Sequence, residues 1–285
     1  MKAIQKTELF YPNIINVSHP INSFKVGWWL GLPHTSGGKY FYDLLELNTA
    51  EILNVNSSDF GWKTITRPGG FIGVRLDGNG NQISIPDSSK LQFDSNNFTI
   101  SGWFFLETLN NVNSNGFQTI ISRYESANSK GYQVDVNTSG SIYFKVSLNS
   151  VTSATFASAD GTIAINTWYH FMVIRNGLNF YLYLNGKLVA SGTSDDFWSL
   201  SSTTQNTLIG NLVTNGNQNQ YFQGYVDDIS IHSAALGLIY PFRTYEESSL
   251  GYQNALNRFM ISDAFYLGKP WVYFNVLQNN YGVTL

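Results

Sequence analysis

The chain contains no cysteine among its 285 residues, which excludes disulfide bonds and thiolate metal sites. Its stability must therefore come from packing, and a bound ion is the one further contribution that the sequence leaves open. No stretch approaches the roughly 18 consecutive apolar residues of a membrane-spanning helix. We therefore expect no membrane insertion.

Charged side chains are also scarce, at 12% of the chain against about 25% in an average soluble protein. The formal net charge is −3 and the isoelectric point is near 5.8. Nucleic acids and acidic membranes call for clustered lysine and arginine, so we expect neither as a partner. The expected surface is mostly neutral and polar, which suits a protein on a particle or a cell surface.

Aromatic residues, by contrast, are abundant at 15% of the chain. The most informative segment is Thr167–Ser191, which reads as three short strands joined by tight turns at Asn176-Gly177 and Asn185-Gly186. Asn-Gly favours the positive φ angles of a type I′ hairpin turn. Two such pairs nine residues apart predict an antiparallel meander, and hence an all-β fold.

Further short strands are expected between clusters of Asn, Ser and Gly, at the spacing typical of a sandwich or jelly roll. No internal repeat of 20 to 50 residues is apparent, which argues against a propeller or solenoid. The expected strands, the first of them crossing an Asp-Gly-Asn-Gly turn, are Leu76–Ile85, Phe98–Leu106, Thr119–Tyr124, Tyr132–Val136, Ser141–Ser147 and Thr162–Ile165.

Two segments carry patterns that a regular half-buried strand does not explain. Trp168–Ile174 is apolar on both faces, so its outer face must be covered by the chain termini or a partner, or must form a binding face. Val226 and Ile229 are three residues apart, which implies a break in register if both are buried.

The segment Thr167–Ser191 resembles the middle of a laminin-G-like domain of the concanavalin-A-like lectin and glucanase superfamily, where a Trp-Tyr-His strand precedes a Tyr-Leu-Asn-Gly-Lys-Leu hairpin. The resemblance covers about residues 24–236 and implies a single antiparallel β-sandwich. Its other motifs, in order along the chain, are Val26–Leu30, Leu76–Ile85, Phe98–Glu107, Thr207–Asn211 and Tyr221–Ile231.

Residues 1–23 and 237–285 lie outside the resemblance, as an N-terminal arm and a C-terminal extension. Within the extension we predict a helix in Thr244–Met260 and a strand in Pro270–Gln278. Both ends carry large aromatic residues, which chains do not usually leave in water. We therefore expect the termini to make self-association or docking contacts; the alternative is that they cover the outer strands of their own sandwich.

A calcium ion is the one cofactor that the sequence favours. The resemblance implies that the early and final strands lie side by side, so that Asp77 and Asp227 would converge where some relatives bind calcium. Calcium prefers six to eight oxygen ligands, which acidic side chains and loop carbonyls supply. The alternative is structural: Asp77 makes an Asx-turn with Gly78, and Asp227 accepts backbone hydrogen bonds at a bulge.

A glycan site is expected at loop aromatics that lie beside polar groups. Trp198 follows Asp195 and Asp196, and Tyr124 is followed by Glu125. Sugars stack on exposed aromatic rings and hydrogen-bond to Asn, Asp and Gln side chains. The alternative is that both rings only cap the edge of the sandwich.

The sequence does not predict an enzyme. Hydrolases of the resembled superfamily carry Glu-x-Asp-x-Glu on one strand face, and no such run occurs; in a regular strand Asp227 and Asp228 would point to opposite faces. There is no cysteine and no Gly-x-Ser-x-Gly elbow. The histidines His19, His34, His170 and His232 lack the i, i+4 spacing of helical zinc ligands.

These observations predict a non-catalytic recognition or structural protein whose partner is a glycan or a surface protein. The segment Met1–Phe10 lacks the apolar core of a secretory signal. We therefore expect a place on the exterior of a virus particle, as a capsid decoration or fibre-associated component in contact with other virion proteins. A secreted or cell-surface lectin is the alternative, with its signal removed or a signal-independent secretion route.

Overall fold

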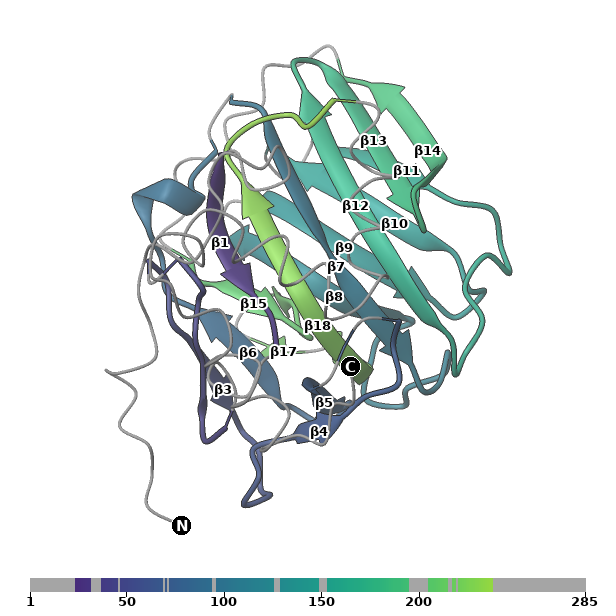
Figure 1. The fold of residues 1–285 in the computed structure, drawn as a ribbon. Coiled ribbons are helices and arrows are strands. Elements are labelled where there is room, and N and C mark those ends of the chain that lie inside the picture. The colour runs from purple at the N-terminus through teal and green to yellow at the C-terminus, as the bar shows by residue number, and fades with distance from the viewer. Residues whose placement is uncertain are drawn as a thin grey trace.

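A computed structural model describes residues 24–31, 37–45, 47–68, 70, 72–93, 96–125, 129–148, 153–194, 205–214, 217–218 and 220–237. These residues form two antiparallel sheets that stack face to face, as Figure 1 shows. The expected all-β sandwich is confirmed. Within the described ranges the one helical element is the 3₁₀ turn η4 (Ser89–Leu91), and no helix there is long and apolar enough to cross a membrane. The helix and strand predicted within 237–285 lie outside the described residues.

The first sheet has eight strands and contains the meander. Seven of the strands follow one another in a continuous order, and the eighth, β1, pairs with β18 on the same edge as β5. In spatial order the strands are β14 (Lys187–Thr193), β13 (Asn179–Leu184), β12 (Trp168–Asn176), β7 (Phe98–Leu106), β18 (Gln223–His232), β5 (Ile72–Asp77) and β4 (Trp62–Thr64), with β1 (Lys25–Trp29) at the side.

The second sheet also has eight strands, and two further strands pair only with each other as a separate ribbon. The ribbon is formed by β16 (Val213–Thr214) and β17 (Asn217–Gln218). In spatial order the strands of the second sheet are β11 (Ser153–Ala157), β10 (Ile142–Ser147), β9 (Lys130–Asn137), β8 (Phe117–Glu125), β15 (Thr207–Ile209), β6 (Gln82–Ile85), β3 (Ala50–Leu53) and β2 (Tyr40–Phe41).

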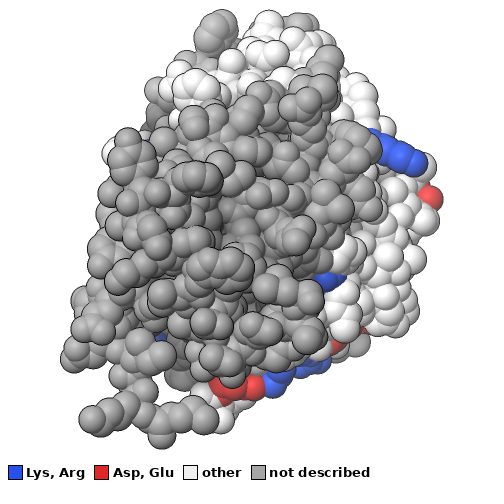
Figure 2. Space-filling view, in the orientation of Figure 1, with Lys and Arg blue, Asp and Glu red and all other residues white. Residues whose placement is uncertain are grey.

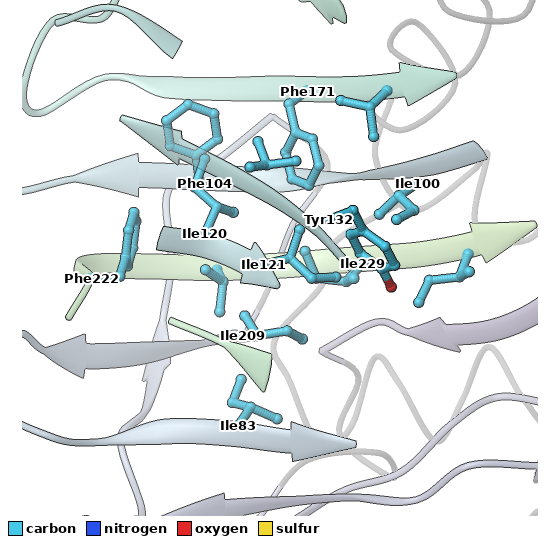
Figure 3. Packing of buried hydrophobic residues seen from close by; sticks show 14 of the residues in the cluster. Ile83, Ile100, Phe104, Ile120, Ile121, Tyr132, Phe171, Ile209, Phe222 and Ile229 are labelled. Carbon is cyan, nitrogen blue, oxygen red and sulfur yellow. The ribbon is translucent and has the colours of Figure 1, made fainter. Parts of the chain in front are cut away.

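One continuous hydrophobic core fills the space between the sheets. Figure 3 shows Phe104, Phe171 and Ile229 of the first sheet facing Ile120, Ile209 and other residues of the second. All five side chains are fully buried. At about 25 cal/mol for each Å² of apolar surface removed from water, this layer is the main stabilising contribution to the fold.

The meander forms as predicted, but its first turn differs from the prediction. Asn185 and Gly186 both have positive φ, at 48° and 76°, and connect paired residues of β13 and β14 as a type I′ turn does. In the first turn Asn176 pairs with Asn179, so the loop is Gly177-Leu178. Only Gly177 has positive φ there, at 62°, which is the pattern of a type II′ turn.

Two further strand predictions need correction. Thr162–Ile165 is a loop, because Gly161 N–H donates to the Ser139 carbonyl and Ile163 N–H donates to the Gly140 carbonyl, so a neighbouring turn satisfies its backbone. Leu76–Ile85 does not form a single strand element. Its two halves belong to β5 and β6, which lie in different sheets, so the Asp-Gly-Asn-Gly turn carries the chain from one sheet to the other.

Strand β12 is buried on both faces, as its sequence indicates. Phe171 and Val173 point into the main core. On the opposite, outer face, Met172 and Ile174 form a second cluster with Leu236, and both are at most 2% exposed. The outer face of the first sheet is therefore not a simple solvent-exposed surface.

Candidate functional site

Strand β18 contains a bulge at the point where its neighbour changes. Gln223–Val226 pairs with β5, whereas Ile229–His232 pairs with β1 along the same edge. Asp227 and Asp228 lie between these two ladders, and Asp228 has a φ of 51°. Val226 and Ile229 are both fully buried, so the register break inferred from their spacing is confirmed.

The bulge turns two adjacent carboxylates toward a single cation. Arg67 Nε donates to Asp227 Oδ2 at 2.6 Å, and Arg67 Nη2 lies 3.7 Å from Asp228 Oδ2. Trp28 Nε1 donates to the other oxygen of Asp228 at 2.7 Å, and Gly31 N–H donates to Asp227 at 2.8 Å. The alternation of a regular strand, which would place the two acids on opposite faces, does not hold here.

This ion-pair network is closed to solvent. The side chains of Arg67, Asp227 and Asp228 are at most 4% exposed. Burial raises the pKa of Asp227 above its ordinary value, and the neighbouring Asp228 adds to this, while Arg67 and the Gly31 N–H act in the opposite direction. The Arg67 guanidinium carbon also lies 5.3 Å from the centre of the Trp103 ring. The network connects β18, β1 and the segment that contains Arg67.

Asp77 and Asp227 do not meet. Their strands are neighbours, as expected, but Asp77 pairs with Gln223, and Asp227 lies four residues further along β18, about 13 Å away. Asp77 accepts the Asn79 N–H at 2.8 Å, which is the Asx-turn alternative. The Asp227 carboxylate is instead paired with Arg67. Calcium binding elsewhere stays a prediction; the described residues contain no group of three or more His, Cys, Asp or Glu side chains suited to a metal.

An aromatic row crosses the outer face of the first sheet. Trp168 of β12 and Tyr225 of β18 both pair with Phe105 of β7. The alternate residues of these strands, such as Phe104 and Val226, face the core, so the row faces outward. We call Trp168, Phe105 and Tyr225 the aromatic row; all three side chains are half-buried.

The rings of the aromatic row touch but are not coplanar. The centre of the Phe105 ring lies 5.4 Å from that of Trp168, with an angle of 51° between the ring planes. It lies 5.6 Å from the centre of the Tyr225 ring, with an angle of 87°. Within the described part of the chain, neither the Trp168 indole N–H nor the Tyr225 hydroxyl makes a hydrogen bond. The row therefore presents apolar faces together with two polar groups that remain available.

A polar strip lies beside the aromatic row. Arg75 of β5 lies opposite Tyr225 of β18 and so continues the aromatic row onto the next strand. Two residues along the strands, Gln223 of β18 lies between Glu107 on one side and Asp77 of β5 on the other. Arg75 Nε and Nη2 donate to the two oxygens of Glu107, each at 2.8 Å. This hydrogen bonding raises the pKa of Arg75 above its usual value, so the guanidinium stays charged. Their side chains remain 36% and 21% exposed, within reach of a ligand.

The other residues predicted from the sequence lie elsewhere. Asp195, Asp196 and Trp198 fall outside the described residues, so their role as ligands stays a prediction. Tyr124 is not in a loop: it lies in β8 and pairs with Gly131 of β9, in the second sheet.

Sequence reasoning did not find the aromatic row, although each member belongs to a strand that it placed correctly. The signal was present in the alternation, because Trp168, Phe105 and Tyr225 occupy outward positions of strands whose inward positions are already apolar. What was missing was the register between β12, β7 and β18, which brings residues 168, 105 and 225 together.

Comparison with solved structures gives the same fold. The binding domain of Paraclostridial mosquitocidal protein 1 is 15% identical with a TM-score of 0.63, over 79% of this chain and 52% of that one. The receptor-binding domain of botulinum neurotoxin D is 18% identical with a TM-score of 0.59, over 79% and 53%. A serotype D ligand-binding domain in complex with N-acetylneuraminic acid is 15% identical with a TM-score of 0.59, over 78% and 50%.

The chain thus spans about half the length of these structures, and identities this low show the fold alone. No curated protein matches the chain significantly. A family model described as the concanavalin A-like lectin/glucanases superfamily matches residues 77–238, which is more than half of the chain. This match, together with the strand order and the two stacked sheets of the protein, identifies the chain as a member of the concanavalin A-like lectin/glucanase superfamily.

Proposed function

We propose that this protein is a non-catalytic recognition module that binds a glycan on the outer face of its first sheet. The observation that carries the proposal is the aromatic row with the polar strip beside it. The C–H faces of a pyranose ring pack on aromatic rings, and its hydroxyls hydrogen-bond to side chains such as Arg and Glu. The family membership and the fold shared with toxin binding domains support the same class of function.

Glycoside hydrolysis is the competing function, and Asp77 and Glu107 are the pair it would need. Only Gln223 separates them in the cross-strand row, which puts their backbones about 10 Å apart. Such hydrolysis needs one carboxylic acid that can give its proton to the leaving group. Both oxygens of Glu107 instead accept hydrogen bonds from Arg75, so Glu107 is held as an acceptor. This arrangement makes Glu107 unsuited to the acid role, which supports recognition over turnover.

We further propose that the protein acts on the exterior of a virus particle, with a secreted or cell-surface lectin as the alternative. The low charge content and the absence of cysteine support an exposed, neutral particle surface. On the face that Figure 2 shows, the visible described residues are mostly uncharged, and most of their charged side chains lie along the lower margin and the right edge. Portal, terminase or tail genes beside the coding sequence would support the virion assignment, whereas polysaccharide-utilisation genes would support the lectin.

The binding proposal is tested by screening the purified full chain on an array of soluble glycans and, in parallel, by assaying the same glycans for new reducing ends. We expect saturable binding to at least one glycan and no release of reducing ends. Absence of binding across the array would refute the proposal. Turnover that disappears in an Asp77→Asn or Glu107→Gln variant would replace it with hydrolysis.

A further inference from the structure

We infer that the aromatic row and the polar strip together bind one or two pyranose residues of an uncharged, soluble glycan, in preference to sialylated or sulfated chains and to crystalline polysaccharide. This inference rests on the proposed function and names the ligand class of the same site. Three features of the described residues carry it: the mutual tilt of the rings, the charge of the polar strip, and the polar groups that remain available beside the rings.

The ring angles exclude a flat polysaccharide surface as the ligand. A crystalline chain presents its sugar rings in one plane, so it needs several coplanar aromatic faces at once. Here Phe105 and Tyr225 are almost perpendicular, at 87°, and Trp168 is tilted by 51° from Phe105. Such a faceted surface fits a single ring, or two rings that turn relative to one another, as in a soluble oligosaccharide.

The charges of the polar strip disfavour an acidic glycan. Arg75 is the one cation of the strip, and Glu107 already neutralises it through two hydrogen bonds. Asp77 adds an exposed carboxylate in the same cross-strand row as Glu107. The strip therefore carries a net charge of −1, which repels the carboxylate of a sialic acid or a sulfate ester and leaves an uncharged sugar unaffected.

The available hydrogen-bonding groups match sugar hydroxyls. Arg75 uses Nε and Nη2 for Glu107, so its Nη1 donors have no partner among the described residues. The Trp168 indole N–H and the Tyr225 hydroxyl are equally unused in that part of the chain. A hydroxyl both donates and accepts, so it can satisfy donors and carboxylate oxygens at neighbouring positions, which a purely anionic group cannot.

The test compares the full chain with single variants on matched pairs of soluble glycans, each neutral glycan beside its sialylated or sulfated form. We expect the unmodified protein to prefer the neutral member. Tyr225→Ala and Trp168→Ala should weaken neutral-glycan binding by about tenfold or more, as loss of a central aromatic contact does. Tyr143→Ala is the matched control, because Tyr143 is also a half-buried outward tyrosine but lies on the other sheet.

A second variant tests the charge argument independently of ring removal. Glu107→Gln removes the carboxylate that neutralises Arg75, so it should shift the neutral-to-anionic binding ratio toward anionic glycans by about three- to tenfold, the effect of one unit charge at roughly 6 Å. Near-ultraviolet circular dichroism reports whether each variant is folded, and Trp168→Phe should retain part of the binding that Trp168→Ala loses.

The outcomes separate this inference from the proposed function. Glycan binding that is unchanged in folded Tyr225→Ala and Trp168→Ala variants would overturn the site while leaving glycan recognition in place. A preference of the unmodified protein for anionic glycans, or retention on insoluble cellulose or chitin, would overturn the ligand class. Absence of binding to every glycan would refute the proposed function itself.

Discussion

At the scale of single residues, Arg67 is the side chain that the two acids of the β18 bulge share. It faces two buried carboxylates and stacks near Trp103, and its own side chain is 1% exposed. A buried pair of this kind adds little net stability over apolar packing, because removing its charges from water is costly. Removing one partner alone is far worse, since the other charge stays buried without compensation.

We therefore predict that Arg67→Met lowers the free energy of unfolding by about 3–5 kcal/mol. The control is Lys63→Met, which breaks the exposed ion pair of Lys63 with Asp59 and should hardly move the transition. Urea unfolding followed by tryptophan fluorescence measures both. Equal midpoints for the two variants would show that the network does not hold the bulge in place.

The residues of the candidate site show where sequence reasoning reaches its limit. Strands could be predicted, because alternation and Asn-Gly turns are local signals: Phe98–Leu106 has the predicted bounds, and the strand Trp168–Asn176 begins at the predicted residue. The aromatic row could not be predicted, because it depends on pairing between residues that lie more than 50 positions apart in the sequence. The same reason explains the outcome for Asp77 and Asp227. Their strands were correctly predicted to be neighbours, but the pairing puts Asp77 opposite Gln223 and not opposite Asp227.

At the scale of elements, the bulge in β18 allows one strand to serve two partners. Between Val226 and Ile229 the strand contains one more residue than β7 opposite it, because Asp227 pairs with Trp103 whereas Ser230 pairs with Ser101. The extra residue lets both flanking segments keep their apolar side chains in the core. Single-residue deletions can therefore test whether the bulge sets which side chains of β18 face the core.

Deletion of Asp228 should leave the protein folded, because it makes β18 regular and keeps Val226 and Ile229 on the inner face. The variant loses the acceptor of the Trp28 indole N–H, so we expect a stability loss of roughly 1–3 kcal/mol. Deletion of Ser230 should instead turn Ile231 outward and prevent folding. Soluble yield and thermal unfolding of the two deletions decide the matter, and the reverse ranking would contradict this account of the bulge.

At the scale of the whole molecule, the described residues account for a complete two-sheet sandwich, while the large aromatic residues of 1–23 and 237–285 lie outside them. Our prediction that these termini make docking or self-association contacts depends on their composition, with Trp271 and Phe274 among the residues concerned. Nothing in the sandwich itself requires a second copy of the chain, since its core is closed between the two sheets.

Removal of residues 237–285 should therefore give a soluble, folded protein of lower assembly state than the full chain. Light scattering coupled to size exclusion measures the mass, and circular dichroism measures the fold. An insoluble or unfolded product would mean that the extension is part of the core, and an unchanged assembly state would place the contacts elsewhere.

The central claim is that the aromatic row is the glycan-binding site, and a structure of the full chain with a bound neutral oligosaccharide tests it most directly. We predict a pyranose ring packed against Trp168 or Tyr225, with a hydroxyl within hydrogen-bond distance of Arg75 or Glu107. A sugar bound instead at Trp198, at Tyr124 or anywhere else away from the outer face of the first sheet would contradict it.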